Sequence, residues 1–480
     1  MPTSWPPEEI RRIGYHVVDL IAEHLSSMSD RPVFRAMPRD LVDDFLTGPL
    51  PKHGVSADDV IRDFRERIEP YPFGNGHPRF WGWVNPPPIV IGVFAEALAA
   101  AMNPSCAGGN HAATYVERQV IAWFRGLLSF PAEGMGLLVS GGSMASLTAL
   151  AVARHVKAGV DVRRDGLCGT RTPFRFYQSS EGHSCLRKAV ELLGFGQASI
   201  RIVPVDDSYR LDVRALEAAI GEDVVNGVRP IAVTATAGSV NTGAIDPLAA
   251  IADVCRRHDV WFHVDAAYGG PAILADTYRA VLEPLALADS VALDPHKWLY
   301  IPVEAGLVLV RDAEAMRATF SLVPPYIRTA GSATGVFGLP WFSEYGFQQT
   351  RGFRALKVWM ALKHLGLDGY KRAIEENLAL ARYLAERVQQ TPDLDLVSTT
   401  LSIVCFRFRP AQLEHDADID RLNRELLERL QLGGEAFVTS TELRGRFVLR
   451  ACIVNHLSSR ADVDLMISAV CRIGTELAAA

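Results

Sequence analysis

The sequence lacks a long uninterrupted hydrophobic run and an N-terminal secretory signal. Its most apolar stretch, residues 89–102, contains Glu96 and falls short of the roughly 18 to 20 apolar residues that a membrane-spanning helix needs. We therefore expect a buried helix there. Residues 1–9 have no basic region followed by an apolar one, which argues against secretion. These absences predict a cytoplasmic protein with no membrane partner.

Paired cysteines and a strong excess of one charge are missing as well. The seven cysteines are scattered singly, which is typical of reduced thiols in the cytosol. The chain has 49 Lys and Arg residues against 55 Asp and Glu, and its formal net charge is −6. This balance provides no basic surface for a polyanion, so we expect no nucleic-acid partner.

The spacing of apolar residues predicts three parts in this chain of 480 residues. Helical spacing from Ile10 to Leu25 and over 56–68 indicates an N-terminal helical segment that ends in a Pro- and Gly-rich stretch. Further on, long helical patterns cover 353–365 and 370–389. The expected parts are a helical segment at 1–76, a large α/β domain at 77–350 and a small C-terminal α+β domain at 351–480.

Short apolar runs alternate with helical segments between residues 136 and 310, a pattern that predicts a mostly parallel sheet with helices on both faces. The runs are 136–139, 174–178, 199–205, 230–234, 260–264, 289–293 and 306–310. In such sheets, ligands bind beyond the carboxyl ends of the strands. Small, acidic, basic and imidazole side chains follow five of the runs, at 140–143, 179–183, 236–242, Asp265 and 294–297. We expect these strand ends to form one site for a polar ligand.

The turn Gly141-Gly142-Ser143 stands between a predicted strand and a predicted helix, 144–158. Free backbone N–H groups at such a helix start favour a phosphate. The same turn loosely fits a nucleophile elbow, because Gly141-x-Ser143-x-Ala145 is one residue off the Gly-x-Ser-x-Gly pattern. A serine hydrolase that uses Ser143, with Asp265 and His296 following in chain order, therefore stays open as an alternative.

Two further strand ends carry candidate groups. Alternation along a strand puts His263 and Asp265 on one face, which leaves a metal site geometrically open, although a strand-end Asp is often only a cap. Lys297, flanked by His296 and Trp298, fits either a surface lysine or a lysine that forms a Schiff base with a carbonyl group. His183, before a predicted helix, is in isolation more typical of a capping histidine.

Taken together, these residues resemble the group II pyridoxal-phosphate-dependent amino-acid decarboxylases, most closely the aromatic-L-amino-acid decarboxylases. The resemblance covers nearly the whole chain. Its most specific feature is a lysine after Asp-Pro-His at this distance from His-Val-Asp-Ala-Ala-Tyr. The motifs that carry it are His77-Pro78-Arg79-Phe80, Gly142-Ser143, His183, 235–246, 263–268, 294–298, Tyr326 and 447–450.

The resemblance implies a fold-type I, aspartate-aminotransferase-like α/β fold and a homodimer, with pyridoxal 5'-phosphate (PLP) bound covalently to Lys297. It implies that Asp265 pairs with the pyridine nitrogen, that His183 stacks on the ring, and that Tyr326 protonates the substrate α-carbon. These four are the expected catalytic residues, and no metal is expected. The implied cofactor-binding residues are Gly142, Ser143, His183, Asp265, Ala267, Asp294, His296 and Lys297. The implied substrate-binding residues are Phe80, Trp83, Thr350 and Arg450.

The implied activity is that of a carboxy-lyase, which removes the α-carboxyl group of an aromatic L-amino acid of the tryptophan, tyrosine, phenylalanine or dopa type. The products would be the amine and carbon dioxide. An aromatic acetaldehyde synthase on the same scaffold is the nearest alternative. Such relatives typically lose the loop tyrosine or the stacking histidine, and both Tyr326 and His183 are present. Two departures from the better-known animal and plant members are Asp294, where an asparagine is usual near the phosphate, and Ser239-Val240, where a threonine pair is usual.

Overall fold

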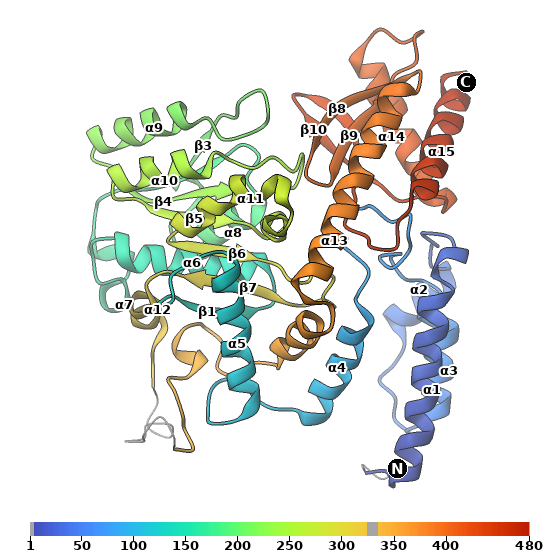
Figure 1. The fold of residues 1–480 in the computed structure, drawn as a ribbon, viewed down its shortest axis with the longest axis horizontal. Coiled ribbons are helices and arrows are strands. Elements are labelled where there is room, and N and C mark those ends of the chain that lie inside the picture. The colour runs from blue at the N-terminus through green and yellow to red at the C-terminus, as the bar shows by residue number, and fades with distance from the viewer. Residues whose placement is uncertain (1–3, 324–334, 480) are drawn as a thin grey trace. The chain divides into compact units, whose positions relative to one another are not determined.

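The computed structural model describes residues 4–323 and 335–479, and its chain divides into two compact units (Figure 1). Unit 1 comprises Met1–Pro87, Leu380–Ser398 and Val404–Ala480, and unit 2 comprises Pro88–Ala379 and Thr399–Ile403. The three-part division expected from the sequence consists of consecutive segments, whereas each of the two units combines stretches that are separate in the sequence. The three-part division stays a prediction. The residues expected to bind the cofactor all belong to unit 2.

Unit 2 is built on a seven-stranded sheet, as far as the described residues show, in the order β1-β7-β6-β5-β4-β2-β3. The pairs β2–β3, β2–β4, β4–β5 and β5–β6 are parallel, and β7 runs antiparallel to both β1 and β6. The mostly parallel sheet is therefore confirmed, and each predicted run overlaps one strand. The strands are β1 (Met135–Val139), β2 (Phe174–Ser179), β3 (Ile200–Val203), β4 (Arg229–Thr236), β5 (Trp261–Asp265), β6 (Ser290–Leu293) and β7 (Gly306–Val310).

Helices cover both faces of this sheet, and Figure 1 shows α9 and α10 above it and α6 below it. β1, β5, β6 and β7 are buried along their whole length, which explains why these strands read as continuous apolar runs. The helices are α4 (Val90–Met102), α5 (Ala112–Leu127), α6 (Gly142–Lys157), α7 (Val162–Asp165), α8 (Ser184–Leu192), α9 (Val213–Val225), α10 (Leu248–Arg257), α11 (Asp276–Leu282) and α12 (Ala313–Phe320).

A second sheet, in the order β10-β11-β9-β8, lies in the C-terminal part of the chain. Trp81, which is fully buried, packs into the core of unit 1 with residues of this sheet and of the last two helices. The strands are β8 (Leu394–Thr400), β9 (Ile403–Phe408), β10 (Thr439–Leu443) and β11 (Arg446–Cys452). The helices are α1 (Pro7–Ser26), α2 (Arg39–Thr47), α3 (Ala57–Arg67), α14 (Asp416–Gly433) and α15 (Arg460–Ala478), while α13 (Arg354–Gln390), interrupted at Gly366, runs from unit 2 into unit 1.

The apolar stretch at 89–102 forms a helix, α4, but the expectation that this helix is buried was wrong. Only Gly92 and Ala95 are buried in it. Leu98 and Met102 are 52% and 57% exposed. A helix that is apolar all round has more apolar surface than one contact face covers, and the rest of α4 faces outward in the single chain. No described helix is long and apolar enough to span a bilayer.

Candidate active site

Lys297 lies on the turn that follows β6, and its side chain folds back into unit 2. Its Nζ atom is 2.9 Å from Oδ2 of Asp294, and the Lys297 side chain is only 26% exposed. The next residue, Trp298, is fully buried, stacks on Tyr268 with 5.1 Å between ring centroids, and donates its indole N–H to Asn377. Because Trp298 holds this turn in the core, Lys297 is not the solvated surface lysine that the sequence left open.

Asp265 ends β5, which is the parallel neighbour of β6, and is 7% exposed. Its Oδ1 atom accepts a hydrogen bond from the backbone N–H of Ala267 at 3.1 Å. Burial lowers the pKa of Lys297, but the carboxylates of Asp294 and Asp265 more than offset this effect, so the pKa lies above its ordinary value. The lysine is therefore held as an ammonium group that pairs with Asp294 and is also stabilised by the charge of Asp265.

The start of α6 lies against the same cluster. A Cβ atom added to Gly142 would lie 3.1 Å from Cβ of Ala267 and 3.1 Å from Oδ2 of Asp294, so the glycine lets three segments meet closely. Within the described residues no side chain caps this helix end, and its first N–H groups are available to an anion. Ser143 is exposed there.

His183 caps α8, as its position in the sequence favours. Its Nδ1 atom accepts the backbone N–H of Cys185 at 3.2 Å, which assigns the ring proton to Nε2. Burial lowers the pKa of His183, and the charges of Asp265, Lys297 and Asp294 also act on it, so this ring belongs to the same cluster.

His296 contacts the carbonyl oxygen of Ala305 through Nδ1 at 2.8 Å, and its Nε2 atom is 3.8 Å from Oδ2 of Asp294. Burial lowers the pKa of His296 too, which favours the neutral ring. No hydrogen bond joins Ser143 to a histidine among the described residues, so the nucleophile-elbow alternative gains no support from the geometry.

His263 binds two serine hydroxyls. Its Nδ1 and Nε2 atoms lie 2.9 Å and 3.2 Å from the hydroxyls of Ser290 and Ser146. Burial lowers the pKa of His263 to about 4. Over residues 4–323 and 335–479 there is no group of three or more His, Cys, Asp or Glu residues that could hold a metal ion. His263 thus ties β5 to β6 and α6 as a neutral residue of the core.

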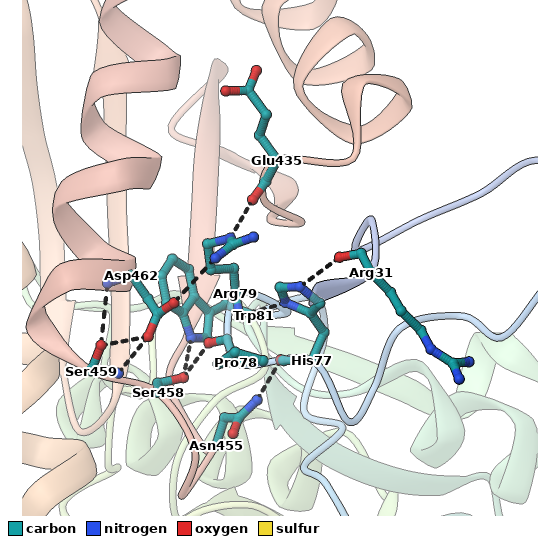
Figure 2. Close-up of polar contacts among 10 residues, drawn as sticks. All are labelled: Arg31, His77, Pro78, Arg79, Trp81, Glu435, Asn455, Ser458, Ser459 and Asp462. Atoms are coloured by element: carbon teal, nitrogen blue, oxygen red, sulfur yellow. Dashed lines mark hydrogen bonds and ion pairs between the residues drawn. The ribbon is translucent and has the colours of Figure 1, made fainter. Parts of the chain in front are cut away.

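The motif His77-Pro78-Arg79 lies in unit 1 and forms, with Trp81 and the residues hydrogen-bonded to it, a polar cluster that Figure 2 shows. We call this group the His77 cluster. His77 is fully buried; its Nε2–H points to the carbonyl oxygen of Arg31 at 3.0 Å, and its Nδ1 accepts the N–H of Arg79 at 3.0 Å. Asn455 donates to the His77 carbonyl at 2.7 Å. Burial lowers the pKa of His77 to about 4. Both ring nitrogens of this histidine are therefore committed to backbone groups.

Three of the predicted substrate residues also belong to unit 1. Phe80 is 1% exposed and stacks on Phe437 with 4.9 Å between centroids, so it is part of the core. Trp83 is 44% exposed and has a positive φ of 47°, which is unusual for a bulky residue. Arg450 donates from a guanidinium N–H to the Trp83 carbonyl at 3.0 Å and holds that backbone in place.

The other predicted residues are placed as follows. Ala267 is buried beside Gly142, and Thr350 is exposed and directly precedes the buried Arg351. Tyr326 lies outside the described residues. All eight residues that the resemblance assigns to the cofactor lie in unit 2, and contacts or charge interactions link Gly142, His183, Asp265, Ala267, Asp294 and His296 to the cluster that contains Lys297.

The sequence does not reveal a buried ion pair that holds β1, the strand before the Gly142 turn. The side chains of Glu117 and Arg351 are both fully buried and form an ion pair. Glu117 also accepts the backbone N–H of Leu138 at 3.0 Å, and Arg351 donates to the carbonyl of Cys106 at 2.8 Å. The pair fixes β1, which leads into the Gly142 turn, to the segment after Thr350. Its partners are 234 residues apart, and no local spacing could reveal them.

Comparison with known proteins identifies the class of this site. Residues 41–409 match the family model described as the pyridoxal-dependent decarboxylase conserved domain. The chain belongs to this family. The decarboxylase is 35% identical over 451 residues to an aromatic-L-amino-acid decarboxylase of Bacillus atrophaeus, covering 93% of this chain and 92% of the relative. It is 28% identical over 466 residues to the phenylacetaldehyde synthase of Arabidopsis thaliana, covering 95% and 94%.

The fold of the decarboxylase also matches that of solved relatives. A crystal structure of Oryza sativa TDC with PLP and tryptamine aligns with a TM-score of 0.92 at 28% identity and covers 99% of each chain. This likeness confirms the expected fold of PLP-dependent decarboxylases. The protein is a carboxy-lyase, and its cofactor is PLP.

The residues around Lys297 fit this cofactor with one exception. The uncapped start of α6 can hold a phosphate, the Asp265 carboxylate can pair with a protonated pyridine nitrogen, and Lys297 can bond to the aldehyde. Asp294 is the exception, because its buried carboxylate lies against the helix start that suits an anion.

Proposed function

We propose that this decarboxylase removes the α-carboxyl group of an aromatic L-amino acid and releases the corresponding amine and carbon dioxide. The observation that carries the proposal is the largely buried Lys297 ammonium group, which pairs with Asp294 at the uncapped start of α6 and is stabilised by the charge of Asp265. The similarity to an aromatic-L-amino-acid decarboxylase over 93% of the chain supports the substrate class.

When bound, PLP supplies the electron sink that accepts the bonding electrons as carbon dioxide leaves. The task of Asp265 is to hold a proton on the ring nitrogen. Two unit charges about 4 Å apart at an effective dielectric near 20 attract by roughly 4 kcal/mol before desolvation, which is enough to fix that proton. The task of Lys297 is to hold the cofactor covalently until the substrate amine displaces it.

The remaining residues position the reactants. His183, whose Nδ1 accepts the N–H of Cys185 at the start of α8, would present Nε2–H to the substrate carboxylate and would contact the cofactor ring. Ala267 would also contact the ring, and Gly142, Ser143 and His296 would hold the phosphate. Tyr326, which lies outside the described residues, gives a proton to the substrate α-carbon. As substrate residues, Phe80, Trp83, Thr350 and Arg450 stay predictions.

The cofactor assignment is tested by colour and by covalent trapping. Purified protein incubated with PLP should be yellow, and borohydride reduction followed by peptide mass spectrometry should find the cofactor on Lys297. Lys297→Ala should lose the label, the colour and the activity. Lys157→Ala, on the surface of the same unit, should keep all three. A label on another lysine would contradict the assignment.

The substrate class is tested by an amino-acid panel assayed for amine and carbon dioxide. Tryptophan, tyrosine, phenylalanine and dopa should give product, whereas glutamate and aspartate should not. The second candidate is an aromatic acetaldehyde synthase, which the similarity to the Arabidopsis thaliana phenylacetaldehyde synthase favours. That activity would consume oxygen and release about one hydrogen peroxide per carbon dioxide, so a peroxide assay separates the two.

We propose further that the active species is a homodimer in the cytoplasm. Exposed apolar residues support the dimer: Ile10 and Tyr15 on α1 are 56% and 69% exposed, and Met102 on α4 is 57% exposed. None of the seven cysteines forms a disulfide bond in the part of the chain that the structure describes, which supports a reducing compartment. Light scattering should give twice the chain mass, and Ile10→Asp should reduce it, whereas Val225→Asp, an exposed site on α9, should not.

A further inference from the structure

Asp294 places a carboxylate where the phosphate of PLP is expected. Its side chain is 3% exposed. A Cβ atom added to Gly142, the first residue of α6, would lie 3.1 Å from its Oδ2 atom and 3.6 Å from its Cγ atom. The carboxylate therefore lies against the helix start, where free N–H groups and the helix dipole favour one anion. A bound phosphate would bring a second.

Among the described residues, the Asp294 carboxylate has a single full positive charge beside it, that of Lys297. Oδ2 is 2.9 Å from Nζ of Lys297, and Oδ1 is buried without a hydrogen-bond partner in the part of the chain that the structure describes. The other titratable groups that face it are His296, His183, Cys185 and Asp265. Burial lowers the pKa of both histidines and raises the pKa of the Cys185 thiol to about 12, so these three groups are neutral near pH 7.

Cofactor binding changes this positive partner. An amine attacks an aldehyde only after losing a proton, and the nitrogen that bonds to PLP keeps at most one N–H, so Oδ2 loses the three-donor ammonium group as its partner when Lys297 bonds to PLP. A phosphate monoester is mostly a dianion above its second pKa of about 6. Two like charges that share a buried site cannot both stay fully ionised, because each strongly disfavours the charged form of the other.

We propose that one proton from solvent enters the pair formed by Asp294 and the PLP phosphate on binding, and that the affinity for PLP therefore weakens as pH rises. The proposal rests on the proposed function, which assigns the start of α6 to the phosphate. The carboxyl O–H then donates a hydrogen bond to a phosphate oxygen. An asparagine amide at this position would donate an N–H instead and would need no added proton.

The test compares PLP with pyridoxal, which has the same aldehyde but no phosphate. Cofactor-free protein is titrated with each ligand between about pH 7 and pH 9, above the phosphate pKa. The ionisation of Lys297 affects both ligands and cancels in the ratio of their dissociation constants. In the wild type, Kd for PLP relative to pyridoxal should rise about tenfold per pH unit, and in Asp294→Asn it should stay level.

Calorimetry in two buffers of different ionisation enthalpy counts the proton directly. The wild type should take up about one more proton with PLP than with pyridoxal, and Asp294→Asn should take up none more. Asp253→Asn, an exposed acid in the same unit, controls for net charge and should match the wild type.

A level ratio in the wild type, or an equal slope in Asp294→Asn, would overturn this proposal even if borohydride labels Lys297. The calorimetric count on the wild type alone decides the matter if the variant does not fold. Absence of the label on Lys297 would overturn the proposed function and this proposal with it.

Discussion

The cluster around Lys297 in unit 2 and the cluster around His77 in unit 1 use the same residue types in opposite ways. In unit 1, His77, Arg79 and Trp81 donate to or accept from protein groups that hold them in place (Figure 2). In unit 2, charged groups are packed together while Oδ1 of Asp294 and the start of α6 have no hydrogen-bond partner in the described chain. A buried polar cluster is suited to binding a ligand when some of its donors and acceptors have no hydrogen-bond partner within the protein.

The largest effect on stability is expected at the Glu117–Arg351 ion pair. This pair lies in unit 2, but its side chains form hydrogen bonds to backbone groups, as those of the His77 cluster do. Glu117→Gln leaves the buried Arg351 charge uncompensated and should lower the free energy of unfolding by about 3 to 5 kcal/mol. Urea unfolding measures this. Glu222→Gln breaks an exposed pair in the same unit and should cost well under about 1 kcal/mol. Equal effects of the two variants would remove the distinction.

The same substitution in the two clusters should separate activity from stability. Asp265→Asn should lower kcat about a thousandfold, in line with roughly 4 kcal/mol of lost stabilisation of the ring proton, with little change in the unfolding midpoint. Asp462→Asn weakens the Ser459–Asp462 capping box of α15 and the contact with Arg79. It should lower stability by about 1 kcal/mol and leave kcat nearly unchanged. An unchanged kcat in Asp265→Asn would contradict the role of that carboxylate.

Acid should act on the His77 cluster through its buried neutral ring. The pKa of His77 is about 4 in the folded chain, against 6.5 for an ordinary histidine. The unfolded chain therefore binds more protons between these values, so stability is present above pH 6.5 and is lost as pH falls toward 4. The loss from this residue should approach about 3 kcal/mol. His77→Gln should remove that part of the pH dependence of the unfolding midpoint, while the part due to His263 remains.

The smallest effect is expected from Ser458, which forms hydrogen bonds to two residues of the His77 cluster. Its hydroxyl donates to the Pro78 carbonyl at 2.5 Å and accepts the indole N–H of Trp81 at 2.9 Å. Ser458→Ala should cost about 1 kcal/mol, because both groups lose their partner. Ser468→Ala, whose hydroxyl is exposed, should cost less. Thermal unfolding of the two variants measures both losses of stability. A larger loss of stability in Ser468→Ala would argue against a stabilising role of the Ser458 hydrogen bonds.

The sequence predicted the sheet of unit 2 well because burial on both faces makes each strand a separate apolar run. It also placed Gly142, Asp265 and Lys297 at one edge, since parallel strands end on the same side. The reversed direction of β7 was beyond reach, because an apolar run has no direction. The charge balance around Lys297 was beyond reach as well, since the pairing of its Nζ with Asp294 depends on side-chain packing.

The exposure of α4 and the role of His77 show the limits of patterns. Apolar spacing predicts that a helix forms, but it does not say whether the partner surface lies in the same chain. The His77 motif is one of those that carry the family resemblance, and the structure shows that both nitrogens of its ring contact backbone groups. Hydrogen-bond saturation of this kind has no signature in local sequence.

The antiparallel pairing of β1 with β7 has a consequence for synthesis of the chain. β1 is an edge strand whose neighbour in the sheet is β7, and Val139 pairs with Gly306. At about 5 to 20 residues per second, a ribosome needs roughly 10 to 30 s to extend the chain from the end of one strand to the end of the other. During that interval the hydrophobic strand before the Gly142 turn has no partner. We therefore expect β1 to reach its place in the sheet only after β7 has been synthesised.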